Sequence, residues 1–248
     1  MLALDATDRH ISAAYLGPGG DRLLASEAGA AEMLPELLNQ LLSDLANNAG
    51  VRINDVAWCA CSVGPGSHTG IRAALAIGKA LNVASRTPLV AVDRFSQLAA
   101  AGLEQKKLSG GLWHIVVPAG RQMVAVQTLE IHQDLQRFQA QDAVRSLNLD
   151  EFFSGASTGS WLIDARITAR LPAFGTGATV ARRVDIDADA RYAASASRQL
   201  VRSGAHIITD GTIAPFYLRP VDAKLTAGQP LIRPVAARRA PCHPAAEG

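Results

Sequence analysis

Short apolar runs alternate with polar turns over the first part of the chain. Three such runs, 2–5, 11–16 and 23–26, are separated by the polar segment 7–9 and the glycine-rich segment 17–21. Apolar runs of this length that are bounded by turn residues are typical of strands. The pattern therefore predicts three short strands joined by turns.

Two longer segments have the pattern of helices. Between residues 32 and 46, leucines recur at intervals of three and four, the spacing that lines one face of an amphipathic helix. These leucines are Leu34, Leu37, Leu38, Leu41, Leu42 and Leu45. Residues 71–84 are rich in alanine, a small residue that lets a second helix approach closely. The two helices form either part of the chain's own core, as most leucine stripes do, or a docking surface.

Further apolar runs continue the alternation of strands and helices. We expect strands at 56–63, 88–92, 113–117 and 123–129, and candidate strands near 160–164 and 206–209. One further helix is expected to begin near Asp93 or Ser96, and another to cover residues 188–203. The order strand, helix, strand, helix closes a first lobe and indicates an α/β fold.

The composition divides the chain into three parts. Between residues 101 and 111 it becomes polar and glycine-containing, so we predict a first lobe over 1–103 and a second over 112–219. Residues 220–248 contain five prolines and several basic residues. We expect this tail to be disordered and regard it as a candidate for contact with RNA or an acidic partner.

Composition narrows the classes of function. The 248 residues are 48% hydrophobic, carry a net charge of only +2, and have no long Lys/Arg run before residue 220. The chain therefore lacks the positive charge needed to hold a nucleic acid by itself. Its three cysteines form neither a disulfide framework nor a Cys-x-x-Cys pair, and no apolar run reaches the roughly 18 residues of a membrane span. We expect a soluble protein of the reducing cytoplasm, without a signal peptide.

Catalytic signatures are missing from the sequence. The six histidines include no i, i+4 pair and no His-Glu-x-x-His, so a metal site carried on one helix is not indicated. Residues 66–70 read Gly-Ser-His-Thr-Gly, which is not the Gly-x-Ser-x-Gly of a serine-hydrolase elbow. The sequence therefore indicates no catalytic residue and no metal site.

A glycine loop joins the predicted strand 56–63 to the helix 71–84. Glycine allows backbone angles closed to other residues, and Ser67 or Thr69 can cap the helix that follows. The spacing matches neither a P-loop nor the Gly-x-Gly-x-x-Gly fingerprint. Such a turn either presents backbone N–H groups to an anion or acidic partner, or is a capped turn without a ligand. The candidates are Gly64, Gly66, Ser67, His68, Thr69 and Gly70, and for His68 a packing or surface role is favoured over that of a general base.

This loop also carries a family resemblance. Residues 64–72, Gly-Pro-Gly-Ser-His-Thr-Gly-Ile-Arg, resemble the Gly-Pro-Gly-Ser-Phe-Thr-Gly-hydrophobic-Arg signature of the bacterial TsaB (YeaZ) family, which helps to make threonylcarbamoyladenosine in tRNA. Residues 2–7 resemble the family's opening, Leu34-Pro35 precedes a leucine helix, and 215–219 match a late motif. The resemblance covers residues 1–219 and is strongest over the first 100.

The resemblance implies an actin-like (ASKHA) two-lobed α/β fold with mixed sheets flanked by helices. It also implies a non-catalytic scaffold for the related enzyme TsaD, a TsaE-like ATPase as a further partner, and tRNA contact only through the complex. ATP, ADP and metal are then expected on the partner subunits, with no cofactor on this chain. An isolated copy is expected to pair with itself through the surface that binds TsaD.

In the family, the two first-lobe helices form the contact with TsaD. Carried over to this sequence, the contact residues are Leu34, Leu37, Leu38, Leu41, Leu45, Ile71, Arg72, Ala74, Leu75 and Gly78. The chain departs from the family at three points. His68 replaces a Phe, Pro118 replaces an acid, and the histidine that often precedes the leucine helix is missing.

Asp5 ends the first predicted strand and is followed closely by Thr7. In actin-like ATPases this place holds a carboxylate that works through a metal ion near the phosphates, whereas an Asp at a strand end commonly caps a turn. A stand-alone actin-like ATPase or small-molecule kinase that uses Asp5, Thr7 and the glycine loop is therefore the second hypothesis. The third is a glycoprotease-like metallopeptidase, whose metal ligands the sequence does not supply.

Overall fold

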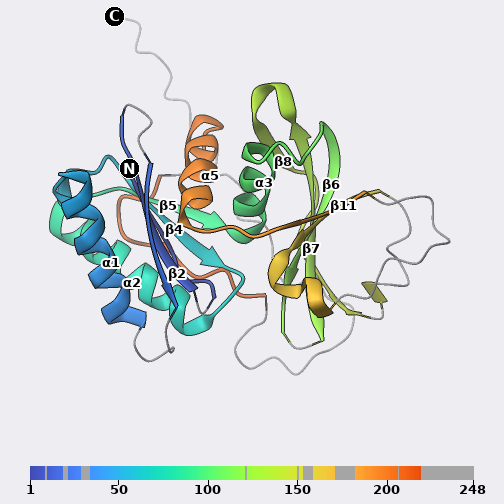
Figure 1. Cartoon of the computed structure of the whole chain (residues 1–248), viewed down its shortest axis with the longest axis horizontal. Coiled ribbons are helices and arrows are strands. Elements are labelled where there is room, and N and C mark those ends of the chain that lie inside the picture. The colour runs from blue at the N-terminus through green and yellow to red at the C-terminus, as the bar shows by residue number, and fades with distance from the viewer. Residues whose placement is uncertain are drawn as a thin grey trace, which may run out of the picture.

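Two mixed sheets lie side by side and are covered by helices (Figure 1). The computed structural model describes residues 1–8, 10–18, 22–28, 34–120, 122–149, 151–152, 159–170, 182–205 and 207–218. The predicted tail lies outside these residues. Among the helices within them, none is long and apolar enough to cross a membrane.

The first sheet has the strand order β3-β2-β1-β4-β5. Its strands are β1 (Leu2–Asp5), β2 (His10–Leu16), β3 (Arg22–Ala28), β4 (Cys59–Gly64) and β5 (Leu89–Asp93). The first three form an antiparallel meander, and β1, β4 and β5 run parallel. The three short strands predicted at the start of the chain are confirmed.

The second sheet repeats this arrangement. Its strands are β6 (Gly111–Pro118), β7 (Met123–His132), β8 (Arg137–Ala140), β9 (Arg145–Asn148), β10 (Ser160–Asp164) and β11 (Arg182–Ile186). A meander of β6, β7 and β8 is followed by parallel strands β10 and β11, in the order β11-β10-β6-β7-β8, while β9 also pairs with β7. The two lobes thus share one topology.

Three strands of the second sheet were not predicted, because their sequences do not show the expected pattern. β8 and β9 have four residues each and are mostly exposed or half-buried, and β11 begins with two arginines. Conversely, the prediction of a strand near 206–209 is wrong. Within the described part of that segment, the structure shows a single bridge between Leu89 and Ile208.

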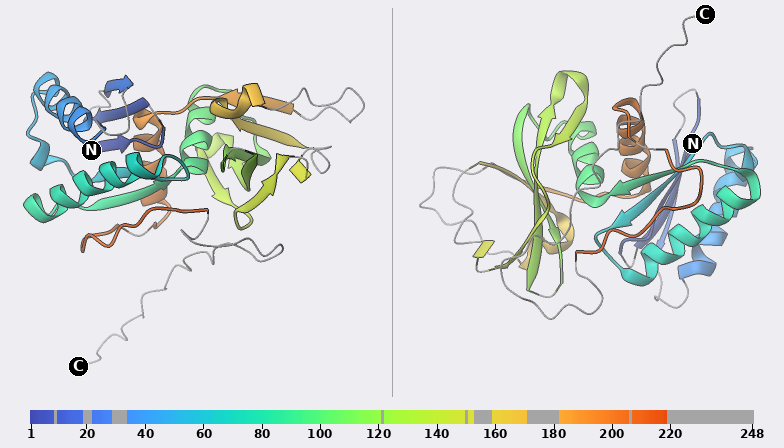
Figure 2. Two further views of the ribbon diagram at one scale, coloured as in Figure 1. Left: turned by 90° about the horizontal axis from the view of Figure 1, so that it is seen from below. Right: turned by 180° about the vertical axis from the view of Figure 1, so that it is seen from behind.

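Helices cover the sheets, and one of them, α3 (Arg94–Glu104), packs between the two lobes. α1 (Leu34–Ala49) and α2 (His68–Ser85) lie on one side of the first sheet, and α5 (Ala190–Arg202) lies on the other side (Figures 1 and 2). α3 follows the first sheet but packs against α5 and the second sheet. Short 3-10 helices are η2 (Ile53–Asp55), η3 (Gln133–Leu135) and η4 (Ala165–Arg170). α5 follows the second sheet in the sequence but packs on the first sheet. The lobe limits predicted from the sequence, 1–103 and 112–219, therefore remain a proposal.

The core follows the alternation of side chains along the strands. Leu4 of β1 and Cys61 of β4 face α1 and α2, where they pack with Leu42, Leu45 and Ile71. The intervening residues Ala3 and Ala60 face α5, where small side chains let the helix lie close to the sheet; the alanines on α5 are Ala190, Ala193, Ala194 and Ala196. The first sheet is therefore buried on both faces.

Candidate functional site

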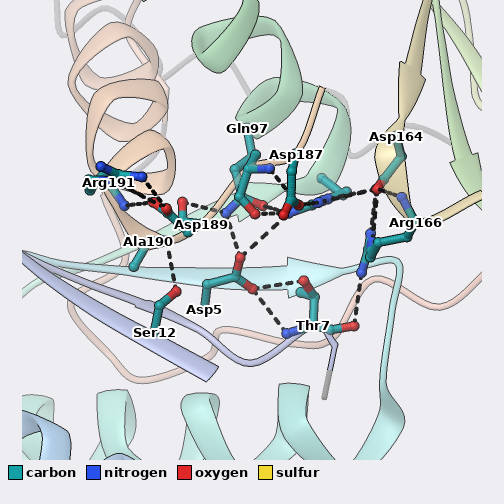
Figure 3. Close-up of polar contacts among 12 residues, drawn as sticks. Asp5, Thr7, Ser12, Gln97, Asp164, Arg166, Asp187, Asp189, Ala190 and Arg191 are labelled. Atoms are coloured by element: carbon teal, nitrogen blue, oxygen red, sulfur yellow. Dashed lines mark hydrogen bonds and ion pairs between the residues drawn. The ribbon is translucent and has the colours of Figure 1, made fainter. Parts of the chain in front are cut away.

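Asp5 lies at the end of β1, between the two lobes, and is only 4% exposed. Its Oδ1 accepts hydrogen bonds from the Thr7 backbone N (3.0 Å) and from Thr7 Oγ1 (2.7 Å). Its Oδ2 accepts from Gln97 Nε2 at 2.6 Å and lies 3.6 Å from Arg94 Nη1 (Figure 3). Both carboxylate oxygens therefore have partners within the chain.

Arg94, the first residue of α3, is 2% exposed and binds across the lobes. Its Nε donates to Asp164 Oδ2 at 2.8 Å, at the end of β10. Its Nη1 donates to the carbonyl oxygen of Ala188 (2.6 Å) and to Gln97 Oε1 (3.1 Å). Its Nη2 lies 3.4 Å from Oδ1 of Asp187. All three nitrogens of this guanidinium thus face protein oxygens.

Arg166 adds a second link between the lobes. Its Nη2 donates to Asp164 Oδ2 at 2.6 Å, and its Nη1 donates to the carbonyl oxygen of Thr7 at 3.2 Å (Figure 3). Thr7 belongs to the turn after β1, whereas Arg166 belongs to η4. We call Asp5, Arg94, Asp164, Arg166 and Asp187 the interlobe ion cluster.

The charges of this cluster compensate each other. Burial alone would raise the pKa of Asp164, which is fully buried, but Arg94 and Arg166 outweigh burial and hold that pKa well below its usual range. Burial likewise works against the Arg94 cation, yet Asp164 and Asp5 raise its pKa above the ordinary value. A buried charge without its partner costs several kcal/mol, so the buried members Asp5, Arg94 and Asp164 depend on one another.

The glycines of the loop are explained by close backbone approach. A Cβ on Gly66 would overlap the carbonyl oxygen of Thr7, and one on Gly70 would overlap that of Ala6. Gly64 adopts a φ of +108°, which favours glycine. The loop is therefore packed directly against the turn that carries Thr7. Whether it also binds an anion stays a prediction.

Ser67 is the N-cap of α2. Its Oγ accepts a hydrogen bond from the backbone N of Gly70 at 3.2 Å, and its own N donates to the Thr7 carbonyl oxygen at 2.7 Å. Of the two predicted caps, Ser67 and Thr69, the structure uses the first. Thr69 is exposed.

His68 lies on the surface beside the last described segment. Its ring stacks on Tyr217 with centroids 5.1 Å apart, and Arg72 Nε donates to the Tyr217 hydroxyl at 3.2 Å. Two segments that resemble family motifs, 64–72 and 215–218, therefore meet in space. Neither spacing nor composition indicated this contact.

The structure divides the predicted partner-binding residues into several groups. Ile71, Ala74 and Leu75 are at most 4% exposed, and a Cβ on Gly78 would lie 2.6 Å from Cys61 Sγ, so this face of α2 packs on the sheet. Leu45 is also buried. Arg72 is exposed. Leu34, Leu37, Leu38 and Leu41 belong to α1, but their side chains lie outside the described part.

A different face of α2 is open to solvent. Val83 is 83% exposed, and it shares the exposed side of the helix with Ala76, Lys79 and Ala80. A single exposed apolar side chain is common on protein surfaces, so Val83 does not by itself mark a contact surface. We call Arg72, Ala76, Lys79, Ala80 and Val83 the outer face of α2.

Several residues of the interlobe ion cluster were missed by sequence reasoning. Asp164 ends the apolar run 160–164 in the same way that Asp5 ends the first strand, and this signal was available. No comparable signal marks Arg94 or Arg166, because their partners are distant in sequence. Within the described residues, no group of three or more His, Cys, Asp or Glu side chains is arranged to hold a metal ion.

Comparison with known proteins identifies relatives of this fold. The family model described as TsaD, tRNA N6-adenosine threonylcarbamoyltransferase, matches residues 29–160, more than half of the 248-residue chain. YeaZ from Pseudomonas aeruginosa superposes with a TM-score of 0.71 at 20% identity, covering 88% of this chain and 98% of that chain. A comparison with curated proteins found no match.

A second solved structure gives the same result. It is an uncharacterized protein with similarity to peptidase YeaZ from Pseudomonas aeruginosa, with a TM-score of 0.67, 22% identity, and coverage of 88% of this chain and 98% of that chain. Two lobes of one topology and these superpositions confirm the predicted actin-like α/β fold. The chain belongs to the TsaD family, and within it the resemblance to the TsaB (YeaZ) proteins is confirmed.

Proposed function

We propose that this chain is a non-catalytic subunit that supports a TsaD-type enzyme in transferring the threonylcarbamoyl group to the tRNA adenosine adjacent to the anticodon. Membership of a family described by that reaction supports the link to tRNA modification. The observation that carries the proposal is that the carboxylate of Asp5 already has partners within the chain. Its two carboxylate oxygens are engaged by Thr7, Gln97 and Arg94.

Phosphoryl chemistry would need these groups to be available. A nucleotide site offers carboxylate oxygens to a metal ion and cationic side chains to phosphates. In this chain Arg94 and Arg166 donate instead to Asp164 and to backbone carbonyl oxygens. Opening the interlobe ion cluster for a ligand would leave buried charges unpaired, at a cost of several kcal/mol. The geometry therefore favours a structural role over catalysis.

The outer face of α2 is the surface that we propose for the TsaD-type partner. Val83 supplies an exposed apolar anchor, Ala76 and Ala80 permit close helix packing, and Lys79 adds a charge at the edge. The neighbouring α1 presents polar exposed residues such as Glu36 and Asp44. An isolated chain would form a homodimer through the same surface.

The remaining assignments follow from this role. A TsaE-like ATPase joins the complex, ATP or ADP and metal bind the partner subunits, and this chain has no cofactor of its own. tRNA is contacted only through the complex, since the chain carries a net charge of only +2. The complex works in the cytoplasm.

The test combines the purified chain with its cognate TsaD and TsaE and measures tRNA modification and TsaD binding. Val83→Asp places a charge on the outer face, and we expect at least about tenfold weaker binding and loss of modification. Leu112→Asp is the matched control, because Leu112 is also an exposed apolar residue (58%) but lies on the second lobe. Equal effects of the two variants would refute the surface.

A second measurement separates the proposal from the kinase hypothesis. The isolated chain is titrated calorimetrically with magnesium and ATP, and turnover is followed over the same range. We expect neither binding nor hydrolysis, because the Asp5 carboxylate is engaged. Magnesium-dependent nucleotide turnover by the chain alone would favour the kinase.

A further inference from the structure

A mostly apolar groove of about 680 Å³ opens between the lobes, separate from the interlobe ion cluster. The first lobe contributes Val63 and Asp93, and α3 contributes Phe95. The second lobe contributes residues of the segment 140–146 between and around β8 and β9. Grooves of this size with few polar groups are typical binding sites, so this groove is a candidate binding site.

The last described residues of the chain form part of its wall. The backbone N of Phe216 donates to the carbonyl oxygen of Val63 at 2.8 Å, and the side chains of Phe216 and Leu218 line the groove. Thirty residues, 219–248, follow Leu218 in the sequence. The described chain therefore ends at the groove, and a further segment of the same molecule begins there.

The charged residues that line the groove are acidic, beside the uncharged polar residues Gln127, Gln141 and Ser146. Asp93 and Asp142 line it, and the described lining residues include no lysine or arginine. Asp93 caps α3 by accepting hydrogen bonds from Ser96, and burial raises its pKa, so its negative charge lies in unfavourable surroundings. Asp142 is held by Thr128 and lies 3.8 Å from Arg145. A cationic group on an apolar body would suit both carboxylates, whereas the phosphates of a nucleotide would be repelled.

The segment that follows Leu218 has this chemistry. Residues 219–248 contain five Lys/Arg and two Asp/Glu, which gives a net charge of +3. The basic residues are Arg219, Lys224, Arg233, Arg238 and Arg239. Within the segment, residues 230–235 read Pro-Leu-Ile-Arg-Pro-Val and combine apolar side chains with one cation. The two prolines restrict the backbone and reduce the entropy lost on docking in an extended form.

We propose that residues 230–235 dock in this groove of the same chain, with Leu231 and Ile232 against its apolar wall and Arg233 beside Asp93 and Asp142. Residues 219–229 can span up to about 36 Å, which is enough to reach any part of a groove that begins at Leu218. Because the segment is tethered, its effective concentration is in the millimolar range, and weak contacts suffice to hold it.

The experiment places a nitroxide at the edge of this segment in the full chain. Gln229→Cys is combined with Cys242→Ser, and the remaining cysteines, Cys59 and Cys61, are fully buried and should not react. Amide NMR signals are then recorded before and after reduction of the label. We expect the oxidised label to remove the signals of residues 142–146 and to leave those of the opposite edge of the first lobe, 52–56, unchanged.

Matched variants test the named contacts. Leu231→Asp should restore the signals of 142–146, whereas Leu225→Asp, the same change outside the docking segment, should not. Asp93→Asn and Asp142→Asn should each restore them in part, and Asn keeps the N-cap at position 93. No attenuation at 142–146, or equal behaviour of the Leu231 and Leu225 variants, would overturn the proposal. So would attenuation that appears only when a labelled chain is mixed with an isotope-labelled one, because the segment would then dock on a second copy.

Discussion

Arg94 and Asp164 are 70 positions apart in the sequence, yet Arg94 Nε lies 2.8 Å from Asp164 Oδ2 between the lobes. Neither side chain is more than 2% exposed, so water does not screen the pair. The start of α3 is thereby held to the end of β10. The two lobes are therefore joined by a buried ion pair.

Removing the central cation should be strongly destabilising. Arg94→Met leaves Asp5 and Asp164 buried with one partner fewer, and we expect a loss of about 3–5 kcal/mol in the free energy of unfolding. Urea denaturation followed by circular dichroism measures this change. Arg191→Met is the control, since Arg191 forms a more exposed pair with Asp189 that is worth about 0–1 kcal/mol. Similar losses in both variants would contradict the role given to the cluster.

The same pair should make stability depend on pH in acid. The pKa of Asp164 is lowered in the folded state, so its contribution is present above the unfolded pKa of about 4 and is lost as the pH falls toward the folded value. The free energy of unfolding should therefore decrease steadily below about pH 5. In Asp164→Asn this part of the slope should disappear. Parallel curves for the two proteins between pH 3 and pH 7 would argue against it.

Asp93 should show the opposite dependence. Burial raises its pKa, so the contribution of this group to stability is greatest at low pH and decreases as the pH rises through the folded pKa. Asp93→Asn removes the charge but keeps the cap, and we expect equal or higher stability at pH 7. Asp93→Ala loses the cap as well and should cost about 1 kcal/mol. Thermal unfolding of both variants measures these stabilities. An Asn variant as unstable as the Ala variant would contradict the view that the Asp93 charge is unfavourable in the folded state.

The glycine loop should not tolerate a methyl group where it meets β1. A Cβ on Gly70 overlaps the backbone carbonyl oxygen of Ala6, so Gly70→Ala must displace backbone and should cost about 3 kcal/mol or more. Gly110→Ala is the control, because its Cβ would lie 3.5 Å from the nearest atom, an ordinary contact. Chemical denaturation compares the two. Nearly equal stabilities would show that the loop does not pack as described.

The two faces of α2 should respond differently to charge. Ala74 is fully buried, and Ala74→Glu should unfold the first lobe or lower its stability by several kcal/mol. Ala76 is exposed two residues away, and Ala76→Glu should fold normally and weaken binding to the proposed TsaD-type partner. Circular dichroism and a binding assay separate these outcomes. A folded Ala74 variant would mean that the core of α2 is assigned to the wrong face.

Local sequence patterns predicted many of the strands and helices of the fold. The turns around 7–9 and 17–21 bounded the first three strands, and the loop 64–72 marked both a strand end and a helix start. These features depend on neighbouring residues, so a single sequence reveals them. The second sheet was harder, because β8, β9 and β11 are stabilised by pairing with other strands and carry no clear alternation of their own.

By itself the sequence determined the α/β class, the glycine loop with two candidate helix caps, and the family resemblance, since each rests on short segments whose chemistry is local. Only the tertiary structure decided which face of α2 is buried, and that Asp5 meets Gln97 from 92 positions away while Arg94 meets Asp164. The reason is physical. Burial and ion pairing arise when distant segments exclude water together, and no periodicity along the chain records which segments those are.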